Sequence, residues 1–516
     1  MRTPPPFDKI LVANRGEIAV RVIRCCREMG VRSVAIFSDV DRKSRHVLEA
    51  DEAHGLQGDS PRQVYLDAEQ IVEIAKEVGA GAIHPGYGFL SENFEFAELC
   101  KISNIVFIGP GPEAIRLMGN KVSARELMRQ AGVAVTPGSD GPVATAADVK
   151  KVADEVGYPI LLKAAAGGGG KGMRIVRDAK TISSALRAVR SEAAASFGDD
   201  AVFVERYVDR PRHIEVQVLA GADGTTLHLG ERECSIQRRH QKLVEESPSP
   251  AVDETLRARL GEMATRAAQA VGYRNAGTVE FIMDEQQNVY FMEMNTRLQV
   301  EHPVTEMVTG IDLVRAQVLI AAGLDPGFTQ DDIRLHGSAI ECRIFAEDPD
   351  NHFLPSPGRI TSYTPASGPG VREDSGVYAG YTVPLDYDPT IGKLIVWGRT
   401  RQTALDRMRR ALGELHIGGV KTTLPFHRAL IDHPAFRAGD IDTHFIDTHS
   451  LAPSAAGGPA IEKAALAVAL AAAHQAAQRL GRDGRRVDPS RRPMSGWKRA
   501  ALSDGMRSRL PGAYRP

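Results

Sequence analysis

The sequence has few cysteines, and they follow no pairing or metal-binding pattern. Its 516 residues include only five, an odd number, and Cys25 and Cys26 are adjacent. The absence of any Cys-x-x-Cys spacing excludes a zinc knuckle, and the number and spacing of the cysteines exclude a disulfide framework. We therefore expect a reducing compartment and a cytoplasmic location.

Long apolar segments and an excess of one charge are also missing. The N-terminus, MRTPPPFDKI, has no apolar core of the kind found in signal peptides. The most apolar stretch of the C-terminal region, residues 464–473, has about ten residues, whereas a membrane span needs about 20. The 64 basic residues nearly balance the 65 acidic ones. This balance argues against nucleic acid or a membrane surface as a partner.

The length and the pattern of apolar residues predict roughly three domains. Residues 1–120 alternate short β-rich runs with helical segments, which is typical of a doubly wound parallel α/β sheet. Residues 121–335 change to an α+β pattern, and the short strands and turns of residues 336–448 predict a mixed β domain. Residues 449–516 become rich in Ala, Gly, Pro and then Arg, which indicates a linker, one helix and a basic tail. The predicted fold class is therefore α/β and α+β, multidomain.

Polar residues alternate with apolar ones near the end of the second predicted domain. In a β-strand successive side chains point to opposite faces, so alternate positions share one face. A polar row of this length is not expected on a buried wall unless ligands or a metal ion pair with it. We therefore predict a strand over residues 293–301 that forms the floor of an active site. Its polar face consists of Glu293, Asn295, Arg297, Gln299 and Glu301.

A glycine-rich loop lies between two β-rich runs. The segment KAAAGGGGKGM begins at Lys163 and contains five glycines and a second lysine, Lys171. Glycine lacks the Cβ atom, so such a backbone can fold closely over a phosphate chain, and the lysines supply positive charge. The spacing matches neither a Walker loop nor the GxGxxG of a dinucleotide site. It predicts a hairpin lid, with a plain flexible linker as the alternative.

Two glutamates are spaced so that neighbouring antiparallel strands would bring them together. Glu280 and Glu293 lie thirteen positions apart, with QQN near the turn between their strands. Together with Asn295 they would form an all-oxygen ligand set, which suits Mg²⁺ or Mn²⁺. The alternative is that Glu280 pairs with a lysine on a solvated face. Because apolar residues flank Glu280, we favour a buried metal site.

The chain resembles the biotin carboxylase family of ATP-grasp ligases, because a full set of that family's motifs occurs in the family's order. The resemblance extends over roughly residues 7–448. It implies that the second domain is an ATP-grasp domain with a lid subdomain at about 136–208, and that the third domain closes the site. The motifs are KILVANRGEIAVRVIR, HPGYGFLSEN, FIGP, KAAAGGGGKGM, ERECSIQRRHQKLVEESPSP, EMNTRLQVEHPVTE and ECRIFAEDP.

The resemblance also implies catalytic roles for individual residues. Glu301 would be the general base that takes the proton of bicarbonate. Arg343 would stabilise the enolate-like ureido oxygen of biotin, with an ion pair to Glu341 or Glu347 as the alternative. Bicarbonate would be held by Lys242, Arg297, Gln299 and the backbone of Val300.

By the same resemblance, ATP would lie between the lid and the larger half of the ATP-grasp domain. On its own, His213 is more typical of a packed or capping histidine, and only the resemblance favours it as a ligand. Cys234 is expected to pack in the core, because the implied mechanism needs no nucleophile. The residues implied to surround ATP are Lys121, Lys163, Gly168, Gly169, Gly170, Met173, Glu205, Tyr207, Val208, His213, Gln237 and His240.

The implied reaction is the ATP-dependent carboxylation of biotin through carboxyphosphate, which decomposes to CO₂ and phosphate. No MKM-type biotinylation motif occurs in the sequence, so we expect biotin on a separate biotin carboxyl carrier protein. Carboxyltransferase subunits of an acetyl-CoA or propionyl-CoA carboxylase are further expected partners, and we expect a homodimer or a larger complex. The alternatives are the biotin-carboxylating subunit of a pyruvate carboxylase, another ATP-grasp ligase, and a non-enzymatic scaffold or RNA-binding protein.

The C-terminal tail is strongly basic. From Ala477 onward it has eleven Lys or Arg against three Asp, together with Trp497. We predict that this segment tethers the carrier or carboxyltransferase subunit, with the aromatic side chain as an anchor. A disordered, solubilising tail is the alternative, because the segment has few large apolar groups to bury.

Overall fold

The computed structural model describes residues 6–58, 60–164, 172–449 and 451. These residues fall within one compact unit, residues 1–453. The predicted C-terminal helix and basic tail lie outside the described residues, as does the glycine stretch at 167–170. Among the residues that are described, no helix has both the length and the apolar character needed to cross a membrane. All five cysteines are buried and free, which confirms the absence of a disulfide framework.

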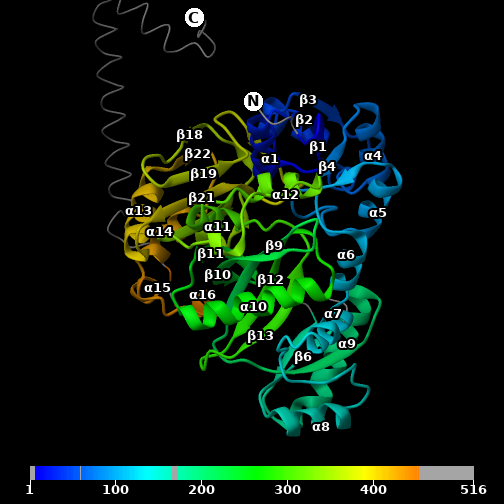
Figure 1. The fold of residues 1–516 in the computed structure, drawn as a ribbon. Coiled ribbons are helices and arrows are strands. Elements are labelled where there is room, and N and C mark those ends of the chain that lie inside the picture. Colours follow the sequence, from blue (N-terminus) through cyan, green and yellow to red (C-terminus); the bar gives the residue numbers. More distant parts are fainter. Residues whose placement is uncertain (1–5, 59, 165–171, 450, 452–516) are drawn as a thin grey trace, which may run out of the picture. The chain divides into compact units, whose positions relative to one another are not determined.

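The N-terminal residues form a parallel sheet, as the alternating pattern predicts. The strand order is β3-β2-β1-β4-β5, and every pairing is parallel. Side chains of β1 enter two different core clusters: Ile10 packs with α1, and Leu11 packs with α4 and α5. The sheet is therefore covered by helices on both faces (Figure 1). Its elements are β1 Lys9–Val12, α1 Gly16–Met29, β2 Arg32–Phe37, α2 Arg45–Glu49, β3 Glu52–Gly55, α3 Pro61–Val64, α4 Ala68–Glu77, β4 Ala82–His84, α5 Phe94–Ile102, β5 Val106–Phe107 and α6 Pro112–Gly119.

An eight-stranded antiparallel sheet forms the centre of the described chain. Its order is β13-β12-β9-β10-β11-β14-β21-β19, so strands from both sides of the predicted boundary at residue 335 share one sheet. The β9–β10 hairpin turns at Asp223-Gly224, where Gly224 has a φ of 90°. The strands are β9 Arg212–Ala220, β10 Thr226–Arg238, β11 Gln241–Ser247, β12 Asn275–Met283, β13 Val289–Asn295, β14 Ser338–Phe345, β19 Val371–Ser375 and β21 Thr390–Gly398.

Helices cover this sheet and complete its core. Helix α10 packs its Leu260 and Ala264 against the apolar side chains of β9 and β12. In the C-terminal part, Leu405 and Met408 of α13 pack on β14 and β21. The helices are α7 Lys121–Gln130, α10 Glu254–Ala270, α11 His302–Thr309, α12 Leu313–Ala321, α13 Arg401–Glu414, α14 Leu424–Asp432, α15 Pro434–Ala438 and α16 Phe445–Thr448.

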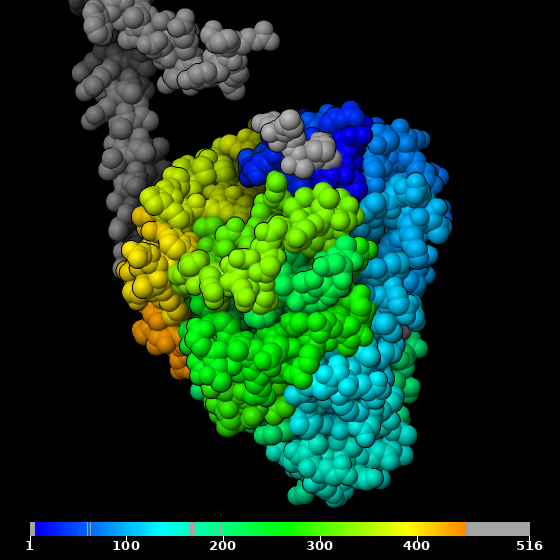
Figure 2. Space-filling model, in the orientation of Figure 1, coloured from blue at the N-terminus to red at the C-terminus, as the bar shows by residue number. Residues whose placement is uncertain are grey.

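A small three-stranded sheet with two helices makes up the predicted lid region. Its order is β7-β6-β8, with β6 Ile160–Ala164, β7 Met173–Val176 and β8 Val202–Arg206. The pairing of β6 with β7 is antiparallel, which confirms the predicted hairpin on either side of the glycine loop. The helices α8 Ala146–Val156 and α9 Ile182–Phe197 cover its apolar face. Figure 2 shows this region in cyan and teal below the green atoms of the central sheet.

Short strands and 3-10 turns connect the larger elements. The short strands after residue 345 give the C-terminal part the mixed β character that was predicted. They are β15 Glu347–Asp348, β16 Leu354–Pro355, β17 Gly358–Arg359, β18 Ser362–Thr364, β20 Thr382–Val383 and β22 His416–Gly418, and the 3-10 turns are η1 Asp39–Asp41, η2 Ala179–Thr181, η3 Gln330–Asp332 and η4 Pro349–Asn351.

The strand predicted over residues 293–301 is wrong in its second half. β13 ends at Asn295, and residues 296–301 form an irregular turn before α11 begins at His302. The backbone N–H of Thr296 donates to Glu92 Oε1 at 3.1 Å instead of to a strand partner. The alternation of polar residues here therefore reflects a turn whose side chains converge, not one face of a strand.

Three buried histidines make the fold sensitive to acid. His46, His84 and His427 are fully buried, and burial lowers the pKa of each to about 4. The unfolded chain takes up these protons near pH 6.5, so the stability they contribute is complete above that pH and is lost as the pH falls toward 4. Replacing His46 with Gln should reduce the slope of the free energy of unfolding against pH by up to about 1.4 kcal/mol per pH unit.

Urea unfolding followed by circular dichroism between pH 7 and 4.5 measures this slope. The exposed His336→Gln variant is the control and should follow the wild-type slope. Equal slopes for both variants would contradict the assignment.

Candidate functional site

A cavity of about 1230 Å³ is lined by the central sheet, the lid strands and the carboxyl end of β1. It receives Asn14 and Arg15 from the loop after β1, and Lys163 and Glu205 from the lid. Every predicted site residue whose side chain is described lines this cavity. Gly168, Gly169 and Gly170 lie outside the described residues. Lys121 begins α7, but its side chain also lies outside the described part.

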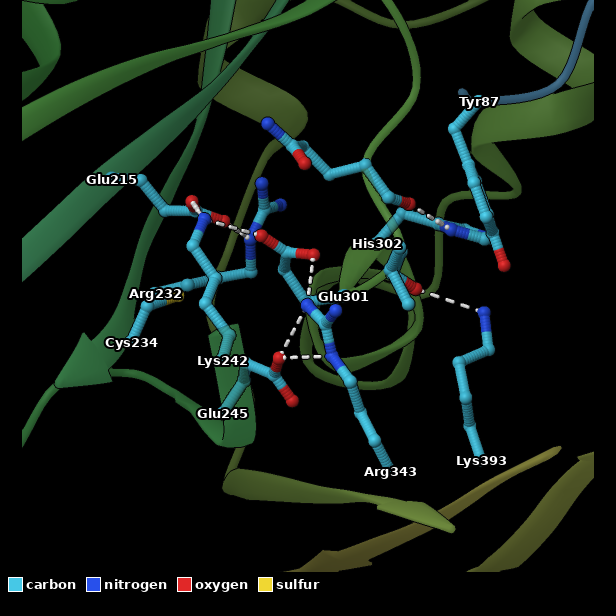
Figure 3. A network of polar contacts seen from close by, with 12 residues as sticks. Tyr87, Glu215, Arg232, Cys234, Lys242, Glu245, Glu301, His302, Arg343 and Lys393 are labelled. Atoms are coloured by element: carbon cyan, nitrogen blue, oxygen red, sulfur yellow. Dashed lines mark hydrogen bonds and ion pairs between the residues drawn. The ribbon is translucent and has the colours of Figure 1, made fainter. Parts of the chain in front are cut away.

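Lys242 of β11 lies at the centre of the cavity floor and binds three carboxylates. Its Nζ donates to Glu280 Oε1 at 2.8 Å. It also donates to Glu301 Oε1 at 2.7 Å and to Glu215 Oε2 (Figure 3). Burial alone would lower the pKa of Lys242, but these carboxylates raise it well above its ordinary value. The ammonium group therefore stays charged and holds together glutamates that would otherwise repel one another.

Glu301 is held by cations on both of its carboxylate oxygens. Lys242 binds Oε1, and an Nη of Arg343 donates to Oε2 at 2.8 Å. Burial would raise the pKa of Glu301, but Lys242, Arg343 and Arg232 hold it well below its ordinary value. Glu301 is therefore a fully buried, ionised carboxylate.

Arg343 of β14 does not form the ion pair that the sequence left open as an alternative. Its Nε donates to Glu245 Oε1 at 2.6 Å, and its other partner is Glu301. Glu347 pairs with Arg238 at 2.9 Å. Burial raises the pKa of Glu245 to about 7, and Arg343 is the main group that counters this rise.

Sequence reasoning missed a buried arginine behind this cluster. Arg232 of β10 has no exposed surface, and its guanidinium binds Glu215, Gln217 at 2.7 Å and Thr305 at 2.9 Å. The signal was present, because His213, Glu215 and Gln217 alternate along β9 just as the recognised polar row does. Two residues of this second polar face, Glu215 and Gln217, are the partners that hold Arg232 in place.

Two of the three predicted metal ligands, Glu280 and Glu293, lie directly opposite each other. In the β12–β13 register Glu280 pairs with Glu293, which confirms the predicted hairpin arrangement. Asn295 Nδ2 donates to Glu280 Oε1 at 2.8 Å, and His213 Nε2 lies 2.8 Å from Glu280 Oε2. Burial would raise the pKa of Glu280, but Lys242 and His213 lower it strongly. Glu280 is therefore charged, and it does pair with a lysine, although in a buried site.

A second group of possible metal ligands is better explained as an ion-pair cluster. His213, Glu215 and Glu280 bring ligand atoms within 4.8 Å of one another. Lys242 Nζ contacts both glutamates of this group. Because Glu215 is already held by two cations, Arg232 and Lys242, a divalent cation on this group of three would meet like charges.

Arg297 lies in the irregular turn and links it to the N-terminal part of the chain. Its Nε donates to Glu92 Oε2 at 2.8 Å, and one Nη donates to Gln299 Oε1 at 3.0 Å. The other Nη lies 3.2 Å from Asn295 Oδ1. The polar side chains of this turn therefore line one end of the cavity. The sequence predicted that they line the site, but it predicted a strand where the structure has a turn.

The lid end of the cavity contains charges that were not all predicted. Glu205 of β8 pairs with Lys163 of β6, and Arg125 of α7 also donates to it. Near the same end, Tyr207 Oη lies 3.2 Å from His444 Nε2. Arg125 and His444 carried no motif signal, because each comes from a helix or loop far away in the sequence.

Cys234 packs in the core, as predicted. It is fully buried, and burial raises the pKa of its thiol well above the ordinary value. A neutral, enclosed thiol is a poor nucleophile. It therefore contributes packing rather than chemistry.

Three family models match the chain in succession. The model described as biotin carboxylase, N-terminal domain, matches residues 6–115. The model of the carbamoyl-phosphate synthase L chain, ATP binding domain, matches residues 120–326. The model described as biotin carboxylase C-terminal domain matches residues 341–448.

Individual proteins are similar over the same range. A biotin carboxylase of Nostoc sp. is 54% identical over 440 residues, which cover 85% of this chain and 98% of that protein. A pyruvate carboxylase subunit of Methanothermobacter thermautotrophicus is 52% identical over 443 residues, covering 86% and 90%. The crystal structure of the biotin carboxylase domain dimer of Hydrogenobacter thermophilus 2-oxoglutarate carboxylase, with MgADP, ADP and bicarbonate, is 49% identical, with a TM-score of 0.82 and coverage of 86% and 98%.

The buried Arg232 should be essential for stability. Replacing it with Met leaves Glu215 with Lys242 as its remaining cation and removes the donors to Gln217 and Thr305. Breaking a buried pair on one side costs roughly 3–5 kcal/mol, and we expect a loss of this size in the free energy of unfolding. Urea denaturation measures it.

The double variant Arg232→Met with Glu215→Gln removes both charges and should recover part of the loss. Arg116→Met, which breaks the exposed pair with Glu113, should have a much smaller effect. If Arg232→Met were no more destabilising than Arg116→Met, the buried pair would not be a stabilising element.

Proposed function

Because the chain belongs to the biotin carboxylase family, we propose that it carboxylates biotin on a separate carrier protein as a subunit of an acetyl-CoA or propionyl-CoA carboxylase. The chain is an ATP-dependent carboxylase of the ligase class. The observation that carries the proposal is the convergence of Lys242 and Arg343 on the buried Glu301. Cations beside an ionised carboxylate can bind a small anion, and the carboxylate can take up the proton of that anion.

Glu280, Glu293 and Asn295 are the proposed ligands of Mg²⁺ or Mn²⁺. Their oxygen atoms suit a hard cation, and the register of β12 with β13 brings the two glutamates together. The low pKa of Glu280 keeps this ligand charged. When bound, the metal ion neutralises charge on the phosphate groups during phosphoryl transfer.

The nucleotide is proposed to bind at the lid end of the cavity. Lys163 and the glycine loop would meet the phosphates, and Glu205 with the backbone at Tyr207 and Val208 would meet the base. Gln237 Nε2 lies 2.6 Å from His213 Nδ1, so these two side chains act as one polar unit in that wall. The full proposed set is Lys121, Lys163, Gly168, Gly169, Gly170, Met173, Glu205, Tyr207, Val208, His213, Gln237 and His240.

Bicarbonate is proposed to bind beside Glu301, held by Lys242, Arg297, Gln299 and the Val300 backbone. Lys242, which binds Glu301 Oε1 in this structure, is also one of the groups proposed to hold the anion. Bicarbonate would therefore compete for this cation and leave a Glu301 oxygen able to accept its proton. A bicarbonate oxygen then attacks the γ-phosphoryl group, ADP leaves, and carboxyphosphate is formed.

Biotin is proposed to react in the same cavity. Carboxyphosphate decomposes to CO₂ and phosphate, and the phosphate takes the ureido proton of biotin. The deprotonated ureido nitrogen then forms a bond to the carbon of CO₂, which gives carboxybiotin. Arg343 would stabilise the negative charge on the ureido oxygen. Exclusion of water protects the intermediate from hydrolysis.

The acceptor of the carboxyl group has two candidates. An acyl-CoA is our first choice, and pyruvate is the second, because the pyruvate carboxylase subunit of M. thermautotrophicus is 52% identical. Co-purification from native cells, with identification of the carboxyltransferase, separates them. An acyl-CoA carboxyltransferase in the complex supports the first, and a pyruvate-specific one overturns it.

The purified protein should release ADP slowly with bicarbonate and Mg²⁺, and faster when free biotin is added. Biotin consumes the carboxyphosphate intermediate, so the rate of ADP release rises. A coupled ADP assay measures both rates, and omission of bicarbonate is the control. A preparation that binds nucleotide but shows no response to biotin would refute the activity.

Glu301→Gln keeps the shape of the site and removes the proton acceptor. We expect kcat to fall by about 10²-fold or more, the usual scale for a lost general base. Glu293→Gln is the matched variant and should instead raise the Mg-ATP concentration needed for half-maximal rate. If Glu301→Gln kept its kcat while nucleotide affinity collapsed, the two assigned roles would have to be exchanged.

A further inference from the structure

Lys393 of β21 is a fully buried cation that no part of the proposed chemistry uses. Its Nζ donates to the backbone carbonyl of Val300 at 2.8 Å and lies 3.1 Å from Glu17 Oε1. Tyr87, which lines the cavity, donates its hydroxyl hydrogen to the same oxygen of Glu17. Lys393 therefore joins the turn before α11 to Glu17 of α1 and, through Glu17, to Tyr87 in the loop after β4.

Three neighbouring strands each direct one cation at this turn. Lys242 comes from β11, Arg343 from β14 and Lys393 from β21, and these strands are adjacent in the sheet. Arg343 and Lys393 are direct cross-strand partners. Figure 3 shows Lys242 and Arg343 reaching the carboxylate of Glu301 and Lys393 reaching the same turn. Lys242 and Arg343 hold the two carboxylate oxygens, whereas Lys393 holds the backbone.

The hydrogen bond from Lys393 to the Val300 carbonyl fixes the backbone position of Glu301. The Val300 carbonyl belongs to the peptide unit that also carries the N–H of Glu301, and this unit is planar. Fixing the carbonyl oxygen therefore fixes the plane to which the Cα atom of Glu301 is attached. Without Lys393 the carboxylate would keep its cations but would lose its backbone anchor.

The charge of Lys393 is maintained by nearby carboxylates. Burial alone would lower its pKa, but Glu17, Glu341 and Asp374 raise it above the ordinary value. A buried charge is costly to keep and seldom adds net stability over an apolar residue of similar size. A buried ammonium group aimed at one carbonyl therefore points to a need for precise geometry.

We propose that Lys393 is a positioning residue for the carboxylation reaction: it fixes the Val300–Glu301 peptide and, through Glu17 and Tyr87, ties Glu301 to the cavity wall built by the N-terminal part. This inference rests on the proposed role of Glu301 as general base. A shift of about 1 Å in a reacting group costs roughly 10²-fold in rate, so even a small relaxation of the turn is measurable.

The decisive comparison is between two variants that both remove the ion pair. Glu17→Gln abolishes the pair but keeps the Lys393 bond to Val300. The double variant Glu17→Gln with Lys393→Met removes the bond as well, and it also removes the Glu17 charge that Lys393→Met alone would leave without its ion-pair partner. We expect kcat of the double variant to be at least about 10-fold below that of Glu17→Gln, with half-saturation by Mg-ATP changed less than about 2-fold.

Measuring Lys393→Met in a Glu301→Gln protein shows whether Lys393 acts by positioning Glu301 or only by stabilising the fold. If Lys393 acts through Glu301, Lys393→Met should cost much less in a Glu301→Gln protein than in the wild type, because coupled residues are not additive. A merely structural role would give equal costs in both backgrounds. Arg401→Met, which removes a cation from the buried Glu246 of β11 outside the cavity, is the stability control and should keep kcat within about 2-fold.

The outcomes distinguish this inference from the proposed function. If the wild type lacks biotin-stimulated ADP release, the proposed function fails. If the wild type is active but the double variant equals Glu17→Gln in kcat, only the role of Lys393 is overturned. Full additivity with Glu301→Gln would overturn it in the same way.

Discussion

The ion-pair cluster around Lys242 is the interaction on which the site depends. One ammonium group binds Glu215 from β9, Glu280 from β12 and Glu301 from the turn before α11. Without a cation these buried carboxylates would repel one another and would take up protons. With it, Glu280 and Glu301 keep low pKa values, and the cavity floor stays negatively charged beside a row of fixed positive charges.

The continuous central sheet makes this cluster possible. Because β11, β14 and β21 are neighbours, cations from residues 242, 343 and 393 reach the same turn from one side. Helix α14 supports the arrangement from behind, since His427 Nε2 lies 2.7 Å from the backbone carbonyl of Arg343. Two segments that the sequence pattern separates at residue 335 thus line one cavity.

Much of the fold could be predicted from local patterns, and less of the site could. Alternating strands and helices gave the N-terminal parallel sheet, and a thirteen-residue spacing around a turn placed Glu280 opposite Glu293. These predictions rest only on residues that are close together in the sequence. The strand prediction failed over residues 296–301 because the chain leaves the sheet to bind Glu92, a residue about 200 positions earlier. Arg232, Glu245 and Lys393 were missed for the same reason, because their partners are set by strand order. The family resemblance supplied the residue roles, and the alternation along β9 was the one local sign that was overlooked.

The position of Lys393 long after Glu301 in the sequence has a consequence for synthesis of the protein on the ribosome. Glu215, Glu280 and Glu301 leave the exit tunnel well before Lys393, which follows Glu301 by about 90 residues, or roughly 5–20 s at usual elongation rates. During that interval β21 does not yet exist, so the turn lacks its backbone anchor and the sheet ends at an unpaired edge. The N-terminal parallel sheet has all its strands by then, but the cavity can close only after translation has passed residue 393.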